Sequence, residues 1–422
     1  MMMYKDLKHR VILIGIIAFV TTSASVKAQE WNQWRGPNRD AIAEDTDLLQ
    51  SWPEDGPKLV WKSTGLGQGF SGVSFWGNKI FTMGDKEDGS YLVCVDKTDG
   101  TLLWSTRVGQ AGGNDRRRPG PRCTPATDGT RVMTVGQYGE VLCADIATGK
   151  EIWRKSYQDD FGGTVVPRWN FCDSPLLDGD RVVFLPGGSK GTMVALNKET
   201  GELIWQTDEV TDNASYSSII TAEISGVKQY ITATDKRVFG IDSQNGRLLW
   251  QASREARNVI PTPIYHDGLV FISSGYNAGC HCFKITEDSG TFKAEQIYDN
   301  GSIANQHGGS ILVGDHIYVS IDQGGKLTCL DLKTGQVAWQ DNSVGKASLG
   351  YADGHLIVRS ENGPVALVEA TPAGYKEKGR FEQPDRSDYN SWPHPVITDG
   401  RLYLRDNDVL LCYELKAADT GQ

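Results

Sequence analysis

The chain has 422 residues, a formal net charge of -10 and 23% charged side chains. This acidic balance argues against the basic surface that nucleic-acid partners require, so we expect no nucleic-acid binding. With 48 glycines and 12 tryptophans beside 6 methionines, the composition favours many short strands and turns. A single hydrophobic core stops growing near about 250 to 300 residues, so the sequence predicts either two domains or a repeated unit.

Residues 1–28 are predicted to be a secretory signal peptide. Basic residues precede the apolar run VILIGIIAFV, and a small-residue stretch ends at Ala28, where we expect cleavage. The apolar run is shorter than the about 20 residues that a membrane span needs. No cysteine stands near the expected cut to carry a lipid. We expect an exported protein, periplasmic or extracellular and not a lipoprotein, in which residues 29–422 form a single domain.

An eleven-residue pattern ending in Trp recurs along the chain. Clear copies read CVDKTDGTLLW, CADIATGKEIW, ALNKETGELIW, GIDSQNGRLLW and CLDLKTGQVAW, and a degraded copy, CFKITEDSGTFKAEQI, lies before the last. Ahead of most copies, two apolar runs flank an Asp-Gly or Gly-Asp pair, as in TPATDGTRVMTVG and SPLLDGDRVVFLPG. Such pairs indicate hairpins, because these turns need positive φ. A period of about 40 to 50 residues with four strands predicts the blades of a β-propeller.

The two ends of the chain are predicted to complete one blade. Trp61 lies in a strand, PKLVWKS, that has no earlier blade strands before it, whereas PHPVITDGRLYLRDNDVLLCYEL supplies three strands without a fourth. Counting fourth strands at Trp61, at the five clear repeats, near Ile297 and near Phe381 gives eight blades. The predicted fold is therefore all-β, an eight-bladed β-propeller of four-stranded antiparallel blades, closed by an N-terminal strand that joins the C-terminal blade. Seven blades are the alternative if a weak copy is absorbed.

Five cysteines occupy the same small-residue slot of the repeat, namely Cys94, Cys143, Cys282, Cys329 and Cys412. Equivalent positions in separate blades are too far apart for a disulfide, which needs Cα atoms within about 7 Å. We therefore expect these five to be free, buried thiols.

The unit CADIATGKEIW resembles the tryptophan-docking motif AxDxxTGxxxW of the pyrroloquinoline quinone-like propeller family. This family includes quinoprotein alcohol dehydrogenases, the outer-membrane protein assembly factor and many exported proteins of unknown role. The segments WNQWRGPNRD, NQHGG and RFEQPDRS look closest to the exported, uncharacterised members. The resemblance implies that a tryptophan locks each blade to the next; these docking residues are Trp61, Trp104, Trp153, Trp205, Trp250 and Trp339.

The chain departs from the dehydrogenases of this family in its cysteines. Those enzymes carry an adjacent cysteine pair against the cofactor, and the sequence contains neither Cys-Cys nor the haem motif CxxCH. The repeat alone keeps pyrroloquinoline quinone with calcium open as a cofactor. No metal-ligand quartet occurs, and Cys280-His281-Cys282 resembles metal spacing only superficially, so no metal site is predicted.

The candidate site lies where the blades begin. In a propeller, the residues just before each first strand converge on the central channel, and two of these connections, 105–123 and 154–173, are far longer than a hairpin needs. The ligand-binding candidates in these places are Arg117, Arg122, Trp169, Asn170, Asp173, Tyr216, Asn258, Asn305, Gln306, His307, Asn390, Trp392 and His394.

This mixture of residue types suits a sugar or another polyol. Aromatic faces stack on sugar rings, amides and carboxylates bond hydroxyls, and arginines clamp carboxylates or phosphates. The amides and hydroxyls can equally serve to satisfy backbone groups where strands begin. Three hypotheses stay open: a binding or scaffold protein for a small polar ligand or a protein partner, a quinone-dependent alcohol or sugar dehydrogenase, and a carbohydrate-processing enzyme using His307 or His394 with a neighbouring Asp. The sequence assigns no catalytic residue and gives no oligomeric signal.

Overall fold

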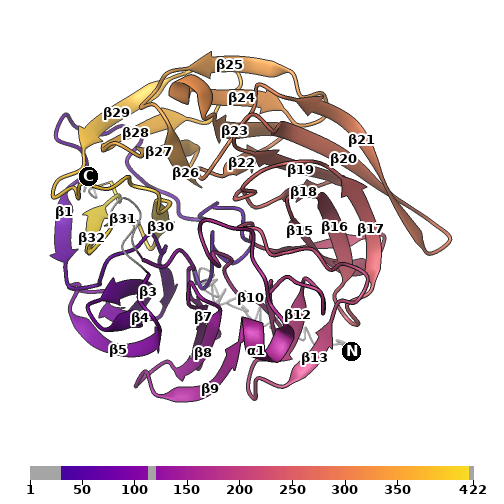
Figure 1. Ribbon diagram of the computed structural model, residues 1–422. Helices are drawn as coiled ribbons and strands as arrows, with labels where there is room; N and C mark the ends of the chain where they lie inside the picture. Colours follow the sequence, from indigo (N-terminus) through magenta and orange to yellow (C-terminus); the bar gives the residue numbers. More distant parts are fainter. Residues whose placement is uncertain (1–29, 113–119, 418–422) are drawn as a thin grey trace, which may run out of the picture.

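The computed structural model describes residues 30–112 and 120–417, so the predicted signal peptide and Arg117 lie outside the described residues. The described chain forms eight four-stranded antiparallel sheets, arranged as blades around a ring (Figure 1). The prediction of an eight-bladed propeller is confirmed, and the seven-blade alternative is wrong. Helical structure in the described part is limited to α1 (Tyr157–Phe161) and a 3-10 turn at Gln323–Gly325.

The strands of each blade follow one another in the sequence. The first three blades are β2 (Ser74–Trp76), β3 (Lys79–Lys86), β4 (Gly89–Asp96) and β5 (Leu102–Gly109); β6 (Ala126–Thr127), β7 (Arg131–Val135), β8 (Glu140–Asp145) and β9 (Glu151–Ser156); and β10 (Leu176–Asp178), β11 (Arg181–Phe184), β12 (Val194–Asn197) and β13 (Leu203–Gln206). The next two are β14 (Ile220–Ile224), β15 (Val227–Ala233), β16 (Arg237–Asp242) and β17 (Leu248–Ser253); and β18 (Ile264–His266), β19 (Leu269–Ser274), β20 (Gly279–Asp288) and β21 (Thr291–Asn300). The last three are β22 (Ser310–Val313), β23 (His316–Ser320), β24 (Leu327–Asp331) and β25 (Val337–Asp341); β26 (Ala347–Ala352), β27 (His355–Ser360), β28 (Pro364–Glu369) and β29 (Glu377–Glu382); and β30 (Val396–Thr398), β31 (Arg401–Asp406), β32 (Val409–Glu414) and β1 (Leu59–Ser63).

The ring closes as predicted. Strand β1 pairs antiparallel with β32, and Trp61 lies opposite Cys412. In Figure 1 the indigo β1 lies at the periphery beside the yellow β32, so the first and last parts of the described chain share one blade. The N-terminal strand covers what would otherwise be an open edge of β32.

The degraded repeat forms a complete blade. Strands β20 and β21 are a hairpin of ten residues each, the longest in the described chain, which projects from the ring in Figure 1. Tyr298 occupies the place of the repeat tryptophan, opposite Cys282. Its hydroxyl donates a hydrogen bond of 2.8 Å to the carbonyl of Leu332 in the next blade. An aromatic ring with a polar tip therefore replaces the missing tryptophan.

The repeat tryptophans contact the neighbouring blade. Trp153 is buried, and its indole N–H donates to the carbonyl of Lys198 at 3.0 Å. Its ring packs on Gly201, where φ is 72° and a Cβ would lie 2.8 Å from the indole. The same kind of inter-blade bond joins Trp61 to Lys97, Trp205 to Ser243 and Trp339 to Thr371. Two tryptophans differ: the indole N–H of Trp104 has no hydrogen-bond partner in the described structure, and that of Trp250 donates to Gln229 of its own blade.

The five repeat cysteines are free and buried, as predicted. Each lies opposite the aromatic residue of the fourth strand, as Cys143 does opposite Trp153. The aromatic ring of the fourth strand leaves room for only a small side chain in this slot, since at Gly240 a Cβ would lie 2.4 Å from the indole nitrogen of Trp250. Burial raises the pKa of the Cys143 thiol to about 12. These cysteines are packing residues of the repeat.

Within residues 30–112 and 120–417, no helix is long and apolar enough to span a membrane.

Candidate functional site

The segment 31–43, which we call the plug, lies inside the ring. It hydrogen-bonds to residues in or just before the first strands of six blades, and in Figure 1 the indigo chain crosses the centre of the ring. The bonds join Trp31 O to Phe75 N, Asn32 O to Thr127 N, Gln33 Oε1 to Leu177 N, Trp34 Nε1 to Thr262 Oγ1, Arg35 Nη2 to Ser310 O, and Ala41 O to Tyr351 N. Sequence reasoning treated WNQWRGPNRD only as a family signature. No local pattern in this segment signals its partners, which lie far along the chain.

Two buried arginines fasten the plug. Arg35 donates to the carbonyl of Ser310 at 2.5 Å, and Arg39 donates to the carbonyls of Pro175 and Ser174 at 2.7 and 3.0 Å. Burial lowers the pKa of Arg35 to about 10 and that of Arg39 to about 9, so both remain protonated at neutral pH. Hydrogen bonds from charged donors are about twice as strong as neutral ones. The plug is therefore a fixed part of the channel.

A pocket of about 780 Å³, counting its open mouth, lies where the channel meets the connections between blades. Seven of the predicted site residues line it, namely Arg122, Trp169, Tyr216, Gln306, His307, Trp392 and His394. Sequence reasoning missed the other seven lining residues, which are Trp34, Phe70, Cys172, Ser174, Ser218, Ile260 and Pro393. Most of these immediately precede first strands. Since residues in such positions converge on the central channel, every one of them could have been included in the prediction. Trp34 comes from the plug.

Aromatic rings from separate connections contact one another around this pocket. The ring of Trp392 lies 4.7 Å from that of Phe70, 6.2 Å from that of Trp169 and 5.7 Å from that of His307. The guanidinium of Arg122 lies 5.4 Å from the ring centres of both Phe70 and Trp169. On the plug side, the ring of Trp34 lies 4.7 Å from that of His394. The pocket is predominantly aromatic, with polar atoms at a few points.

Both histidines in the pocket are neutral at physiological pH. Burial lowers the pKa of His394 to about 3, and burial together with the nearby Lys346 charge holds the pKa of His307 well below its usual value. The Nε2 of His394 lies 2.8 Å from the carbonyl oxygen of His307, so it carries the hydrogen and donates. Neither ring nitrogen of His307 has a hydrogen-bond partner in the described structure. A neutral imidazole carries one donor and one acceptor, and in His307 both are buried and unsatisfied.

Two serines add hydroxyl groups to the pocket wall. The Oγ of Ser174 accepts from the backbone N–H of Thr124 at 2.9 Å, and the Oγ of Ser218 accepts from the N–H of Ser174 at 3.1 Å. A hydroxyl that accepts one hydrogen bond keeps its own hydrogen to donate. The wall therefore holds two hydroxyl groups, each with a hydrogen left to donate, beside the aromatic rings.

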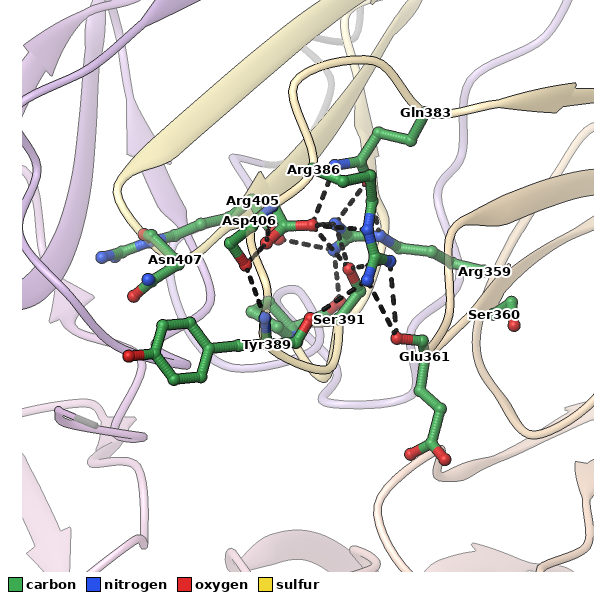
Figure 2. Close-up of polar contacts among 12 residues, drawn as sticks. Arg359, Ser360, Glu361, Gln383, Arg386, Tyr389, Ser391, Arg405, Asp406 and Asn407 are labelled. Carbon is green, nitrogen blue, oxygen red and sulfur yellow. Dashed lines mark hydrogen bonds and ion pairs between the residues drawn. The ribbon is translucent and has the colours of Figure 1, made fainter. Parts of the chain in front are cut away.

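A buried charge network holds the segment 383–394, which carries Trp392 and His394. Figure 2 shows its core, where Arg359 and Asp406, both fully buried, lie 3.9 Å apart. Asp406 accepts hydrogen bonds from the Ser391 hydroxyl at 2.8 Å and the Gln383 amide at 3.1 Å, and pairs with Arg386 at 3.3 Å. Arg359 donates to the carbonyl of Pro393 at 3.0 Å. These bonds explain the segment RFEQPDRS, whose polar residues fix the loop behind the pocket.

The other predicted site residues that the structure describes do not line the pocket. Asp173 points into its own blade, where it accepts hydrogen bonds from the Tyr157 hydroxyl and the Leu185 N–H, and burial raises its pKa to about 6. The Asn305 amide donates to the carbonyl of Ser320 at 2.6 Å. Asn170 and Asn258 occupy turns with φ of 60° and 51°, and Asn390 lies in the connection before Trp392. For Asp173 and Asn305 the backbone-satisfying interpretation fits the contacts.

The lining does not suit a calcium-bound quinone. Calcium takes oxygen ligands, chiefly carboxylates and carbonyls, and no Asp or Glu is among the described lining residues. No group of three or more His, Cys, Asp or Glu in the described parts of the chain is placed to hold a metal. The aromatic walls would accept a flat ring, but the residues present do not supply the metal half of such a site.

A family model described as "Outer membrane protein assembly factor BamB" matches residues 88–341. The chain belongs to this family. BamB of Yersinia pestis is 24% identical over 336 residues, covering 72% of this chain and 76% of that protein. BamB of Shewanella oneidensis is 22% identical over 252 residues, which cover 56% of this chain and 60% of that protein. The chain thus spans 60% of the length of the Shewanella relative and 44% of that of the Salmonella typhimurium relative.

The quinoprotein branch is also similar. The quinoprotein alcohol dehydrogenase PedH of Pseudomonas putida is 28% identical over 164 residues, which are 36% of this chain and 25% of that enzyme. Among solved structures, BamB of Moraxella catarrhalis aligns with a TM-score of 0.58 at 15% identity, over 86% of this chain and 99% of that one. The quinohemoprotein alcohol dehydrogenase of Comamonas testosteroni aligns with a TM-score of 0.53 at 12% identity, over 93% and 82%. At these identities the structural likeness shows the fold alone.

Proposed function

We propose that this protein is an exported, BamB-family propeller that binds a carbohydrate-like ligand in the mouth pocket. The observation that carries the proposal is the pocket itself, in which Trp34, Trp169 and Trp392 present rings beside a neutral His307. Aromatic faces pack on the C–H faces of sugars, and the imidazole and serine hydroxyls pair with sugar hydroxyls. An apolar cavity with a few placed polar groups is the general form of a small-molecule site.

The proposal is one of binding, without catalysis. Hydrolysis of a glycoside normally uses two carboxyl groups that flank the bond, and the described lining contains no Asp or Glu. With pKa values far below neutrality, His307 and His394 are also poor general bases at physiological pH. A pocket that orients a sugar without these groups acts as a receptor site.

A second candidate is a protein scaffold, which the family match to an assembly factor favours. Two features of the fourth strands also favour it. These strands have free edges that a partner strand can pair with, and they carry exposed apolar side chains that such a partner can cover. These residues are Leu59, Val60, Leu102, Leu103, Ile152, Leu203, Ile204, Ile297 and Val337. This candidate places the partner at the periphery of the ring instead of at its mouth.

Calorimetric titration of a panel of sugars and polyols tests the first candidate. Trp169→Ala and His307→Ala should each weaken the ligand by about 1 to 3 kcal/mol, through loss of an aromatic contact or a hydrogen bond. His316→Ala is the matched control, because His316 begins β23 at the opposite face of the ring. Equal affinity in all three variants would exclude the pocket. Capture of a protein partner that is lost in Leu102→Asp, with no sugar bound, would favour the scaffold.

A further inference from the structure

We infer that the mouth pocket takes the terminal ring of an oligosaccharide and that Tyr276, at its rim, stacks on the ring that follows. This inference rests on the proposed carbohydrate function and adds to it the length and direction of the ligand. Two independent features carry it: the plug at one end of the pocket and the conformation of Tyr276 at the other.

The plug makes the pocket a dead end. The plug bonds partly to the middle or end of the first strands, as Trp31 does with Phe75, and partly just before them, as Trp34 does with Thr262 and Arg39 with Ser174. The plug therefore crosses the channel directly behind the pocket, and Trp34 belongs both to the plug and to the pocket wall. A ligand can enter only from the mouth and cannot thread through the ring. A polymer must consequently present an end.

Tyr276 occupies a turn that disfavours its side chain. Tyr276 and Asn277 connect β19 to β20 with φ of 55° and 67°, and the N–H of Ala278 donates to the carbonyl of Gly275 at 3.2 Å. Two successive positive φ values are those of a hairpin turn that prefers Asn-Gly, because a Cβ is unfavourable in the left-handed region. Tyr276 is 43% exposed. The ring is thus retained in a strained, exposed position where the core gains little from it, which is typical of functional sites.

The contacts of Tyr276 place it at the edge of the pocket. Its hydroxyl accepts a hydrogen bond of 2.5 Å from the side-chain amide of Gln306, which lines the pocket. Gln306 is itself fixed, since its backbone N–H donates to Asp322 at 2.9 Å and its side-chain oxygen accepts from Lys346. Both ends of the Gln306 side chain are therefore engaged, which makes it a positioning residue for the tyrosine. An exposed ring held beside the mouth suits the face of a second sugar.

The test compares sugars of increasing length in two matched variants. A panel of free mono-, di- and trisaccharides of glucose, galactose, mannose and N-acetylglucosamine is titrated against wild type to find a series that binds. The disaccharide should bind about three- to tenfold more tightly than its monosaccharide, the range for one added aromatic contact. Tyr276→Asn should abolish this gain and leave monosaccharide affinity unchanged, whereas Tyr276→Phe should keep it. Asn suits the left-handed turn, so the melting temperature of Tyr276→Asn should not fall.

The outcomes separate the two claims. If Tyr276→Asn keeps the gain, or if an oligosaccharide with both terminal rings chemically blocked binds as well as the open one, the inference is wrong while the pocket function stands. If no saccharide binds, or if Trp169→Ala leaves monosaccharide affinity unchanged, the proposed function fails and the inference fails with it.

Discussion

Replacement of Trp153 by alanine tests how the blades are held together. The indole is buried between blades, packs on Gly201 and donates to the carbonyl of Lys198 at 3.0 Å. Removing a buried Trp leaves a cavity and should lower the free energy of unfolding by about 3 to 5 kcal/mol. About 1 kcal/mol of this comes from the lost hydrogen bond, because the Lys198 carbonyl no longer accepts from the indole N–H.

A pair of phenylalanine variants isolates the hydrogen bond. Trp153→Phe keeps a large apolar ring but loses the bond to Lys198, whereas Trp104→Phe loses none, because the Trp104 indole N–H has no partner in the described structure. We expect Trp153→Phe to cost about 1 kcal/mol more than Trp104→Phe. Equilibrium urea unfolding, followed by circular dichroism, measures both. A cost below about 1 kcal/mol for Trp153→Ala, or a larger cost for Trp104→Phe than for Trp153→Phe, would refute the docking argument.

Three further predictions concern protonation, thiols and ring closure. The pKa of His394 is about 3 in the folded protein and about 6.5 when unfolded, so the unfolded state binds more protons between these values. Stability should be full above pH 6.5 and fall as the pH drops toward 3, and His394→Gln should flatten part of this fall in the urea midpoint. A thiol reagent should modify Cys172 before any other cysteine of the native protein, because the others are buried, but slowly, because burial raises the pKa of the Cys172 thiol to about 12; all 8 should react after denaturation. Deleting the chain through Trp61 removes the plug and exposes the edge of β32, so it should lower the melting temperature through both losses and cause association on size-exclusion chromatography through the open edge.

Each of these has a clear contrary result. An identical pH profile in His394→Gln would mean that this imidazole does not titrate as its burial implies. Native reactivity that persists in Cys172→Ser would show that one of the buried cysteines is accessible. An unchanged melting temperature and monomeric behaviour after the deletion would contradict closure by the N-terminal strand.

The sequence predicted the ring more completely than the site, for a physical reason. The repeat tryptophans, small-residue slots and Asp-Gly turns are local patterns. Each can be recognised within a segment of about a dozen residues. Even the weak blade was found, because the gap between Trp250 and Trp339 is two periods long and the degraded copy fills it. The site instead depends on the side chains of the residues that precede the first strands. Some of them point into the channel, and others form hydrogen bonds to nearby backbone groups. Asp173 and Asn305 have the same kind of position as His307, yet Oδ2 of Asp173 and the amide nitrogen of Asn305 bond within the protein.

The plug was beyond the reach of pattern reasoning for a related reason. It has no regular secondary structure, and its conformation depends on left-handed residues such as Arg35 and Arg39, with φ of 60° each, and on bonds to carbonyls far along the chain. Nothing local in WNQWRGPNRD predicts these partners. Without the plug, the pocket would have been expected to be an open channel.

The most direct test of the mouth pocket is a crystal structure of the protein soaked with the tightest-binding saccharide of the panel. The account predicts one sugar ring among Trp34, Trp169 and Trp392, with a hydroxyl within hydrogen-bonding distance of His307 and any second ring beside Tyr276. A sugar bound on the outer strands, or a pocket without sugar at concentrations that saturate binding in solution, would contradict it.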